Sequence, residues 1–400
     1  MQLIEASVLG PDTAGNKTEQ KRRLLLMVET EGNRSYTLDL QRLQGGDVHE
    51  NYLISGEDER MAFETDISLT EHSGTVADLL ANDKAGYQNG REYMRKPQTA
   101  DGDKAFDFSW TGEESGTAVH VYMNGVSDSE LFFSEYPAYR EAHGHKEKEN
   151  DYPGRHFYRR TKVTQGQTTR YAAVYETRKK EQTELVKGVD WQESTPGDAM
   201  SLAAVVDLGD CEDVIYISDD TQKRQAAGLT VSGSVVVVRR NKQTKEVVWC
   251  YLYGEGSAEG NGFSQTGVAD RKYRVYDAQG SLSDSSQNLL KIKGNLDDAA
   301  VPAGTWLKLI FPDRTGWGLK ITKAEQSVIH TEQHPAFQVT ETGSRMLFYP
   351  RVEIELEGRA RITLTDLLGN PLKLREMTQR TYKGDTWVQI KVPSFFENGK

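Results

Sequence analysis

Apolar and polar residues alternate with a period of two along most of this chain, in short runs that end in Gly, Asp, Asn or Ser. The runs are rich in β-branched and aromatic residues, which is the pattern of half-buried strands joined by turns. The clearest predicted strands are 22–30, 35–43, 63–69, 118–124, 130–136, 169–177, 229–240, 246–254, 306–311, 351–358, 359–366 and 387–392. So many short strands at near-regular spacing predict an all-β protein of packed antiparallel sheets, as a sandwich or barrel.

Helical periodicity is scarce. The best candidate is residues 74–86, where Val76, Leu79 and Leu80 lie at helical spacing and Gly86 could end a short helix. No internal period of about 20–50 residues is found, which argues against a propeller or a solenoid.

A stretch rich in Gly and Ser at residues 254–268 follows a strong predicted strand and predicts a domain boundary. We therefore expect a large antiparallel β-sandwich over residues 1–262 and a smaller β-sandwich domain over 263–400. A chain of 400 residues with 36% hydrophobic content is long enough for two such cores.

The composition excludes several classes of partner. The net charge is -11, the pI is about 5.4 and the mean hydropathy is -0.66, so there is no overall positive field for nucleic acid. No run approaches the roughly 18–20 apolar residues of a membrane helix, so we expect no membrane span. Residues 1–23 lack the basic start, apolar run and cleavage site of a secretory signal.

The two cysteines, Cys211 and Cys250, are too few for a disulfide scaffold. Both lie in apolar strand-like runs, where buried free thiols are common, although one bridge between them is an alternative. The chain has no Walker phosphate loop, no Gly-x-Gly-x-x-Gly after a strand, no Gly-x-Ser-x-Gly and no HExxH. Nucleotide-binding, dehydrogenase, α/β-hydrolase and zincin functions therefore have no support.

Four segments, in order, resemble the C-terminal sandwich portion of heparinase II/III-like polysaccharide lyases and the related oligoalginate lyases. They are residues 22–56, 108–141, 156–177, and 203–220 together with 233–256, and a weaker likeness continues through 304–322. In the first segment the family's aspartate, arginine, Gly-Gly pair, histidine and glycine correspond to Asp39, Arg42, Gly45, Gly46, His49 and Gly56. The third ends in the family's small-residue strand closed by a glutamate, here Glu176.

The resemblance implies a supersandwich-like fold and a periplasmic or extracellular location. Members of the family carry an α/α-toroid before the sandwich, and it supplies an asparagine, a histidine and a tyrosine to the cleft. The early sandwich adds a His-x-His-x-Asp motif and a structural zinc site. This sequence has no counterpart of these features, so we expect no catalytic residue, no metal ligand and no cofactor in it, and a toroid encoded upstream as a partner.

Eliminative cleavage of a uronate polymer requires neutralisation of the substrate carboxylate, a base at C5 and an acid for the leaving oxygen. Arginines suit the first task because they bind carboxylates and sulfates bidentately, and tyrosines can stack on sugar rings. The predicted substrate-binding residues are Arg42, His49, Tyr87, Arg91, Tyr139, Arg140, Arg155 and Arg159.

The segment 135–160 is rich in His, Tyr and Arg, but the favoured interpretation is a solvated loop between two strands, with carbohydrate contact as the alternative. His143 and His145 could lie on one face of a strand, yet a metal site needs three or four ligands, and only Glu147 and His156 lie nearby. For His72 and His120 we expect structural roles, with His120 facing away from Val119 and Val121.

Three functional hypotheses follow. The first is the sandwich portion of a polysaccharide lyase, which contributes to binding an acidic, uronate-containing polysaccharide and is inactive without a toroid. The second is a stand-alone carbohydrate-binding module. The third is a structural or interaction protein without a glycan ligand. A large exposed apolar patch on the sandwich would support this hypothesis.

Overall fold

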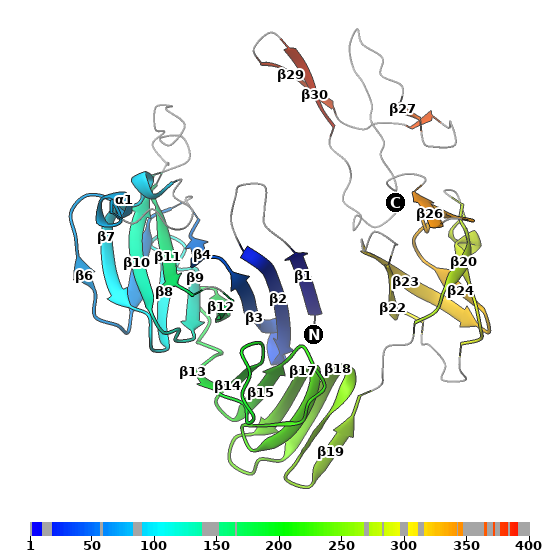
Figure 1. Ribbon diagram of the computed structural model, residues 1–400, viewed down its shortest axis with the longest axis horizontal. Helices are drawn as coiled ribbons and strands as arrows, with labels where there is room; N and C mark the ends of the chain where they lie inside the picture. Colours follow the sequence, from blue (N-terminus) through cyan, green and yellow to red (C-terminus); the bar gives the residue numbers. More distant parts are fainter. Residues whose placement is uncertain are drawn as a thin grey trace. The chain divides into compact units, whose positions relative to one another are not determined.

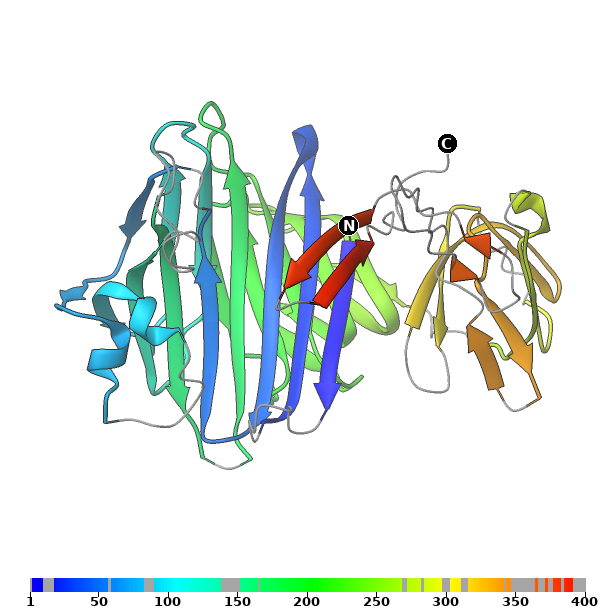
Figure 2. The same ribbon diagram turned by 90° about the horizontal axis from the view of Figure 1, so that it is seen from above.

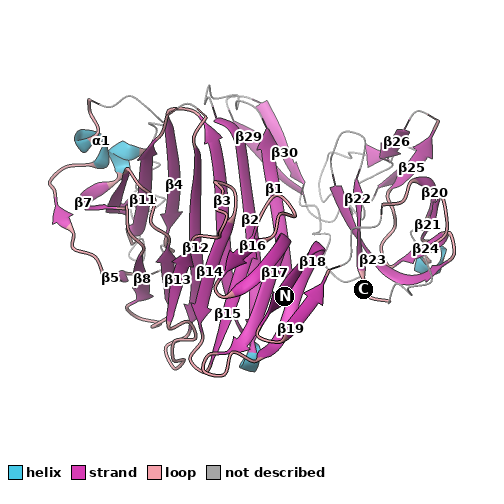
Figure 3. Ribbon diagram, turned by 60° about the horizontal axis from the view of Figure 1, so that its bottom comes forward, coloured by secondary structure: helices cyan, strands magenta, loops and turns pink. Residues whose placement is uncertain are grey.

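The computed structural model describes residues 2–9, 18–56, 59–82, 90–137, 152–164, 166–267, 272–281, 284–296, 303–310, 316–341, 343–346, 364–365, 371–372, 377–382 and 385–390. Strands dominate this part of the chain, so the predicted all-β class is confirmed (Figure 3). The chain divides into two compact units, Met1–Asp270 and Arg271–Lys400. The expected boundary after residue 262 falls just before β19 (Phe263–Thr266), which pairs with β18 (Val247–Gly260) of the first unit.

The described strands of the first unit form three antiparallel sheets, which we name A, B and C. Sheet A has seven strands, in the order β1 (Gln2–Leu9), β2 (Thr18–Thr30), β3 (Arg34–Gly45), β12 (Thr168–Arg178), β9 (Ala118–Met123), β8 (Phe106–Gly112) and β5 (Met61–Thr65). Sheet B has five, in the order β4 (Val48–Ile54), β11 (Gly154–Lys162), β10 (Ser129–Tyr136), β7 (Arg95–Asp101) and β6 (Thr70–Glu71). Sheet C runs β13 (Gly188–Gln192), β14 (Leu202–Asp207), β15 (Cys211–Ile217), β17 (Leu229–Asn241), β18 and β19, with β16 (Arg224–Ala226) paired to β17.

Sheet A is the middle layer of the three (Figures 1 and 2). The alternation along β12 shows why: Ala172 and Val174 pack in one core with residues of sheet C, while Ala173 and Tyr175 pack in another with residues of sheet B. Because successive side chains of a strand point to opposite faces, one strand contributes to both cores. This explains the small, apolar residues Ala172, Ala173 and Val174 in the middle of β12, which is covered on both sides.

Sheet C contains a bend that the sequence pattern does not reveal. The ladder between β17 and β18 is irregular between Gly233 and Val235, and Gly233 has a φ of 112°. A Cβ at Gly233 would lie 2.7 Å from the carbonyl oxygen of Glu255, so no other residue fits without movement. On the face of sheet C away from sheet A, Leu229, Val231 and other buried residues form a third core.

The predicted short helix is present as α1 (Val76–Leu79), a single turn after a capping box in which Thr75 and Asp78 bond each other's backbone N–H groups. Gly86 lies outside the described residues. The buried side chain of Val76 packs with Phe132 and Tyr158 of sheet B, as does Met94 after the 3-10 helix η2 (Arg91–Tyr93). These two short elements cover part of the outer face of sheet B, the face away from sheet A (Figure 1).

The second unit contains a five-stranded antiparallel sheet among its described residues, in the order β20 (Val275–Gln279), β21 (Leu289–Ile292), β24 (Val328–Thr331), β23 (Gly316–Glu325) and β22 (Trp306–Ile310). Its core includes Leu290, Leu319 and Phe337. Strand pairs β25 (Phe337–Thr340) with β26 (Gly343–Met346), β27 (Leu364–Thr365) with β28 (Pro371–Leu372) and β29 (Met377–Tyr382) with β30 (Asp385–Ile390) follow. Two further 3-10 turns are η1 (Glu31–Asn33) and η3 (Ser285–Gln287).

Two other expectations concern single features. Cys211 and Cys250 are both free and half-buried, so they form no bridge with each other. None of the described helices has the length and apolar character needed to cross a membrane.

Candidate functional site

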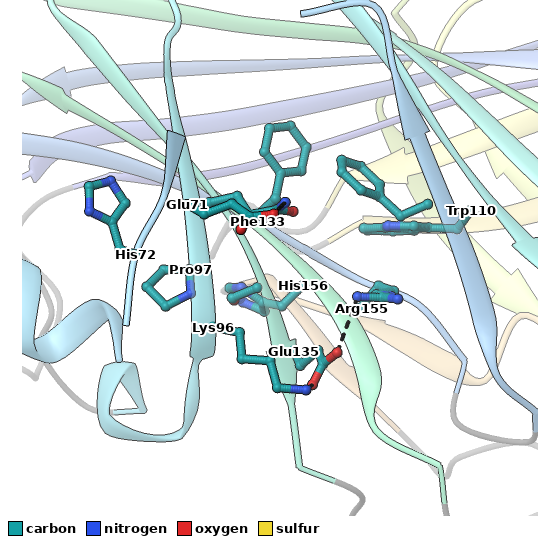
Figure 4. A pocket seen from close by; sticks show the side chains of 12 residues that line it. Glu71, His72, Lys96, Pro97, Trp110, Phe133, Glu135, Arg155 and His156 are labelled. Carbon is teal, nitrogen blue, oxygen red and sulfur yellow. Dashed lines mark hydrogen bonds and ion pairs between the residues drawn. The ribbon is translucent and has the colours of Figure 1, made fainter. Parts of the chain in front are cut away.

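A pocket of about 300 Å³ opens where several strands of sheets A and B end, and it contains more charged side chains than the other hollow described below (Figure 4). Its walls come from β5, β8, β7, β10, β11 and the end of β6. The lining residues are Phe63, Glu71, His72, Lys96, Pro97, Gln98, Trp110, Phe133, Ser134, Glu135, Arg155 and His156.

Two cations share one carboxylate in this pocket. Glu135 lies with one oxygen 2.9 Å from Lys96 Nζ and with the other 3.4 Å from Arg155 Nη1 (Figure 4). Arg155 is also fixed by its Nε, which donates to the carbonyl oxygen of Met61 at 3.0 Å. The Lys96 side chain is 77% exposed, so its ammonium group is accessible to a ligand.

An apolar wall adjoins these charges. The rings of Phe63 and Phe133 lie 4.9 Å apart, and Trp110 packs edge-on against Phe108 at 5.2 Å. Trp110 is buried in the core between sheets A and B. The wall is therefore rigid, because each of its rings is held by other rings of the core.

His156 and Ser134 line the same pocket and are both buried. They lie directly opposite each other on β11 and β10, and neither His156 Nδ1 nor Ser134 Oγ has a hydrogen-bond partner among the described residues. Burial lowers the pKa of His156 to about 4, so this imidazole is neutral at pH 7. His72 is held by Thr99, whose hydroxyl lies 2.8 Å from His72 Nε2.

The other hollow, of about 470 Å³, is lined mainly by apolar residues of β4, β5, β8, β9 and β12. Glu59 is the charged residue of its lining, and both of its oxygens accept hydrogen bonds from the 114–115 turn. This hollow therefore contains fewer groups that could bind a charged ligand than the pocket of Lys96 and Arg155.

Of the residues predicted to bind substrate, Arg155 lies in the pocket. Arg42 is buried on the face of sheet A toward sheet C, where it pairs with Asp219 and, at 3.0 Å, with Glu5. His49 is also buried, with Nδ1 2.7 Å from the hydroxyl of Thr169 and Nε2 2.6 Å from the carbonyl oxygen of Gly45. Burial lowers the pKa of His49.

Arg91 is buried on the outer face of sheet B, where it pairs with Glu50 and donates to the hydroxyl of Tyr158 at 2.8 Å. Arg159 is 0% exposed and lies on the opposite face, toward sheet A. Its guanidinium donates to the Gly102 carbonyl at 2.8 Å, and burial lowers its pKa to about 10. The structure therefore distributes these arginines over three layers and does not bring them into one site.

Tyr87, Tyr139 and Arg140, and the paired histidines His143 and His145, lie outside the described residues. Within the described ranges no three His, Cys, Asp or Glu side chains are grouped so that they could hold a metal ion. His120 faces away from Val119 and Val121, as expected, and its Nε2 lies 3.0 Å from Asp107.

Sequence reasoning missed Lys96 and Glu135. A signal was present for Glu135, because it continues the apolar face of β10 that Leu131 and Phe133 form. When a carboxylate occupies the next position on the buried face of a strand, that end of the strand lies outside the core, where the side chain reaches solvent. No such signal exists for Lys96, which has a φ of 49° outside the regular strand conformation.

A comparison with models of protein families found none that matches this chain, and a comparison with curated proteins found no relative. The resemblance to heparinase II/III-like lyases therefore stays a prediction from four sequence segments.

Proposed function

We propose that this chain binds an acidic, uronate-containing polysaccharide, as the β-sandwich portion of a heparinase II/III-like lyase, and that the pocket of Lys96 and Arg155 holds one acidic sugar. The observation that carries the proposal is that these two cations share the single carboxylate of Glu135. Lys96, Arg155 and Glu135 together carry one net positive charge, and the second carboxylate of the lining, Glu71, pairs with neither cation.

A sugar carboxylate or sulfate suits this arrangement. The guanidinium of Arg155 can bind two oxygens of such a group at once, and the exposed ammonium of Lys96 can turn toward it. The ring of Phe63 and the edge of Trp110 offer an apolar wall for the C–H groups of the sugar. The ligand would then compete with Glu135 for its two partners.

The proposed role is binding and not catalysis. In the family that the sequence resembles, the toroid supplies the asparagine, histidine and tyrosine of the cleavage reaction. We therefore expect that this chain alone forms no unsaturated uronate from heparin, heparan sulfate or alginate, as followed by ultraviolet absorbance. Steady product formation by the isolated chain would contradict the division between binding and catalysis.

Calorimetric titration with uronate disaccharides tests the binding itself. We expect Lys96→Ala to weaken the affinity about fivefold, and added salt to weaken it further, since a partly exposed ion pair is screened. Lys223→Ala is the matched control, because Lys223 is 62% exposed and pairs with Glu259 at 3.2 Å, outside the pocket lining. Equal affinities of the Lys96→Ala and Lys223→Ala variants would contradict the proposal.

A further inference from the structure

Four aromatic rings follow one another across the outer face of sheet B, starting at the 3-10 helix η2. Consecutive ring centroids are 6.3, 6.0 and 5.7 Å apart. We call these residues the aromatic row, and in order they are Tyr93, Tyr136, His156 and Tyr52.

The two ends of the aromatic row are exposed, with Tyr93 at 39% and Tyr52 at 37%. Tyr52 is also well supported, because its ring stacks on that of the buried Tyr158 at 4.6 Å with an interplanar angle of 10°. Tyr158 is itself held by Glu50, which accepts its hydroxyl hydrogen at 2.7 Å. The ring of Tyr52 is therefore an exposed platform that loses little further freedom when a ligand stacks on it.

The middle of the aromatic row contains two unpartnered polar atoms. His156 Nδ1 and Ser134 Oγ lack hydrogen-bond partners within the described part of the chain, and both residues are 6% exposed. A buried polar atom without a partner costs about 1–3 kcal/mol, and these two are the unpartnered atoms of the described chain that belong to residues of the pocket lining. Both residues also line the pocket of Lys96 and Arg155, so the pocket and the aromatic row have two residues in common.

We infer that the aromatic row is a second saccharide subsite, which takes a sugar further along the chain than the disaccharide whose acidic sugar lies in the pocket. A pyranose ring has apolar C–H faces and a rim of hydroxyl groups, so it matches an exposed tyrosine ring beside unpartnered hydrogen-bonding atoms. Its C–H face lies on Tyr52 and its hydroxyls bond His156 and Ser134. The inference rests on the proposed function, since it extends the same bound chain.

Oligosaccharides of two different lengths can be used to test the two subsites separately. A uronate disaccharide is confined to the pocket, whereas a hexasaccharide reaches the aromatic row. We expect Tyr52→Ala to weaken the hexasaccharide about fivefold and to leave the disaccharide unchanged, since stacking on one aromatic ring is worth about 1 kcal/mol. Lys96→Ala should weaken both ligands. Tyr276→Ala, which removes a tyrosine that is 46% exposed in the second unit, is the matched control.

Two conservative variants keep the test decisive if Tyr52→Ala fails to fold. Tyr52→Phe retains the ring and should bind the hexasaccharide as the wild type does. Ser134→Ala removes a hydroxyl that has no partner in the described structure, so the fold should be as stable as before or more so. Its affinity for the hexasaccharide should nevertheless fall about threefold, a loss that a purely structural serine would not produce.

Each result bears on one of the two claims. Equal hexasaccharide affinities of the wild type, Tyr52→Ala and Ser134→Ala would overturn the second subsite, while a loss in Lys96→Ala would still support the pocket. Conversely, unchanged disaccharide binding in Lys96→Ala would overturn the pocket as the acidic subsite. A hexasaccharide bound no more tightly than a disaccharide by the wild type would also overturn the second subsite.

Discussion

The interface between sheets A and C contains a buried ion pair whose removal can be predicted in some detail. Arg239 of β17 donates two hydrogen bonds to Asp213 of β15, at 2.8 and 2.7 Å, and the hydroxyl of Tyr36 in β3 donates a third at 2.7 Å. Asp213 is 0% exposed, and the guanidinium of Arg239 lies 4.9 Å from the ring centroid of Trp249. The change that we consider is Arg239→Met, which keeps an unbranched apolar stem of similar reach.

The substitution would leave the carboxylate of Asp213 in the core with one donor instead of three. Breaking a buried pair in this way typically costs about 3–5 kcal/mol, because the remaining charge is neither paired nor hydrated. A double variant, Asp213→Leu with Arg239→Met, should recover most of that loss, since it removes the uncompensated charge as well. The exposed pair of Lys223 and Glu259 is worth only about 0–1 kcal/mol by the same reasoning.

Hydrogen exchange of the β15 and β17 amides at increasing urea concentration measures the free energy of unfolding of the first unit without interference from the second. We expect Arg239→Met to lower it by about 3–5 kcal/mol and the matched surface variant Lys223→Met to change it by less than about 1 kcal/mol. If both variants lost the same small amount, or if the double variant were less stable than Arg239→Met, the reasoning from the buried charge would be refuted.

Two further predictions concern a turn and a titration. Gly233→Ala should destabilise the first unit by about 1–3 kcal/mol in the same exchange measurement, because of the φ of 112° and the close Glu255 carbonyl, whereas Gly188→Ala, with open space at its Cβ, should be neutral. For His156, burial lowers the folded-state pKa to about 4, so the unfolded chain takes up a proton first. The contribution of His156 to the free energy of unfolding is therefore fully present above pH 6.5. It falls by on the order of 3 kcal/mol as the pH is lowered toward 4. His156→Phe should flatten that part of the stability profile, and profiles that stay parallel for the two proteins would contradict the assignment.

The sequence by itself determined the fold class and the position of many strands. The predicted strands 130–136 and 169–177 correspond to β10 (Ser129–Tyr136) and β12 (Thr168–Arg178). The spacing of Val76, Leu79 and Leu80 marked the short helix α1 correctly. These features follow from local alternation and capping, which depend on neighbours in the chain and can be read without the fold.

Only the tertiary structure decided which face of each strand is covered, and by which sheet. Alternation shows that Arg155, Phe157 and Arg159 share one face of β11, but it does not tell that Arg159 lies inside the sandwich while Arg155 reaches a pocket at its end. Nor does it bring Lys96 to Glu135, because their side chains meet across a strand pairing far apart in sequence. Whether a charged residue is buried depends on the sheet that packs against its strand. That packing cannot be predicted from the order of apolar and polar residues within the strand.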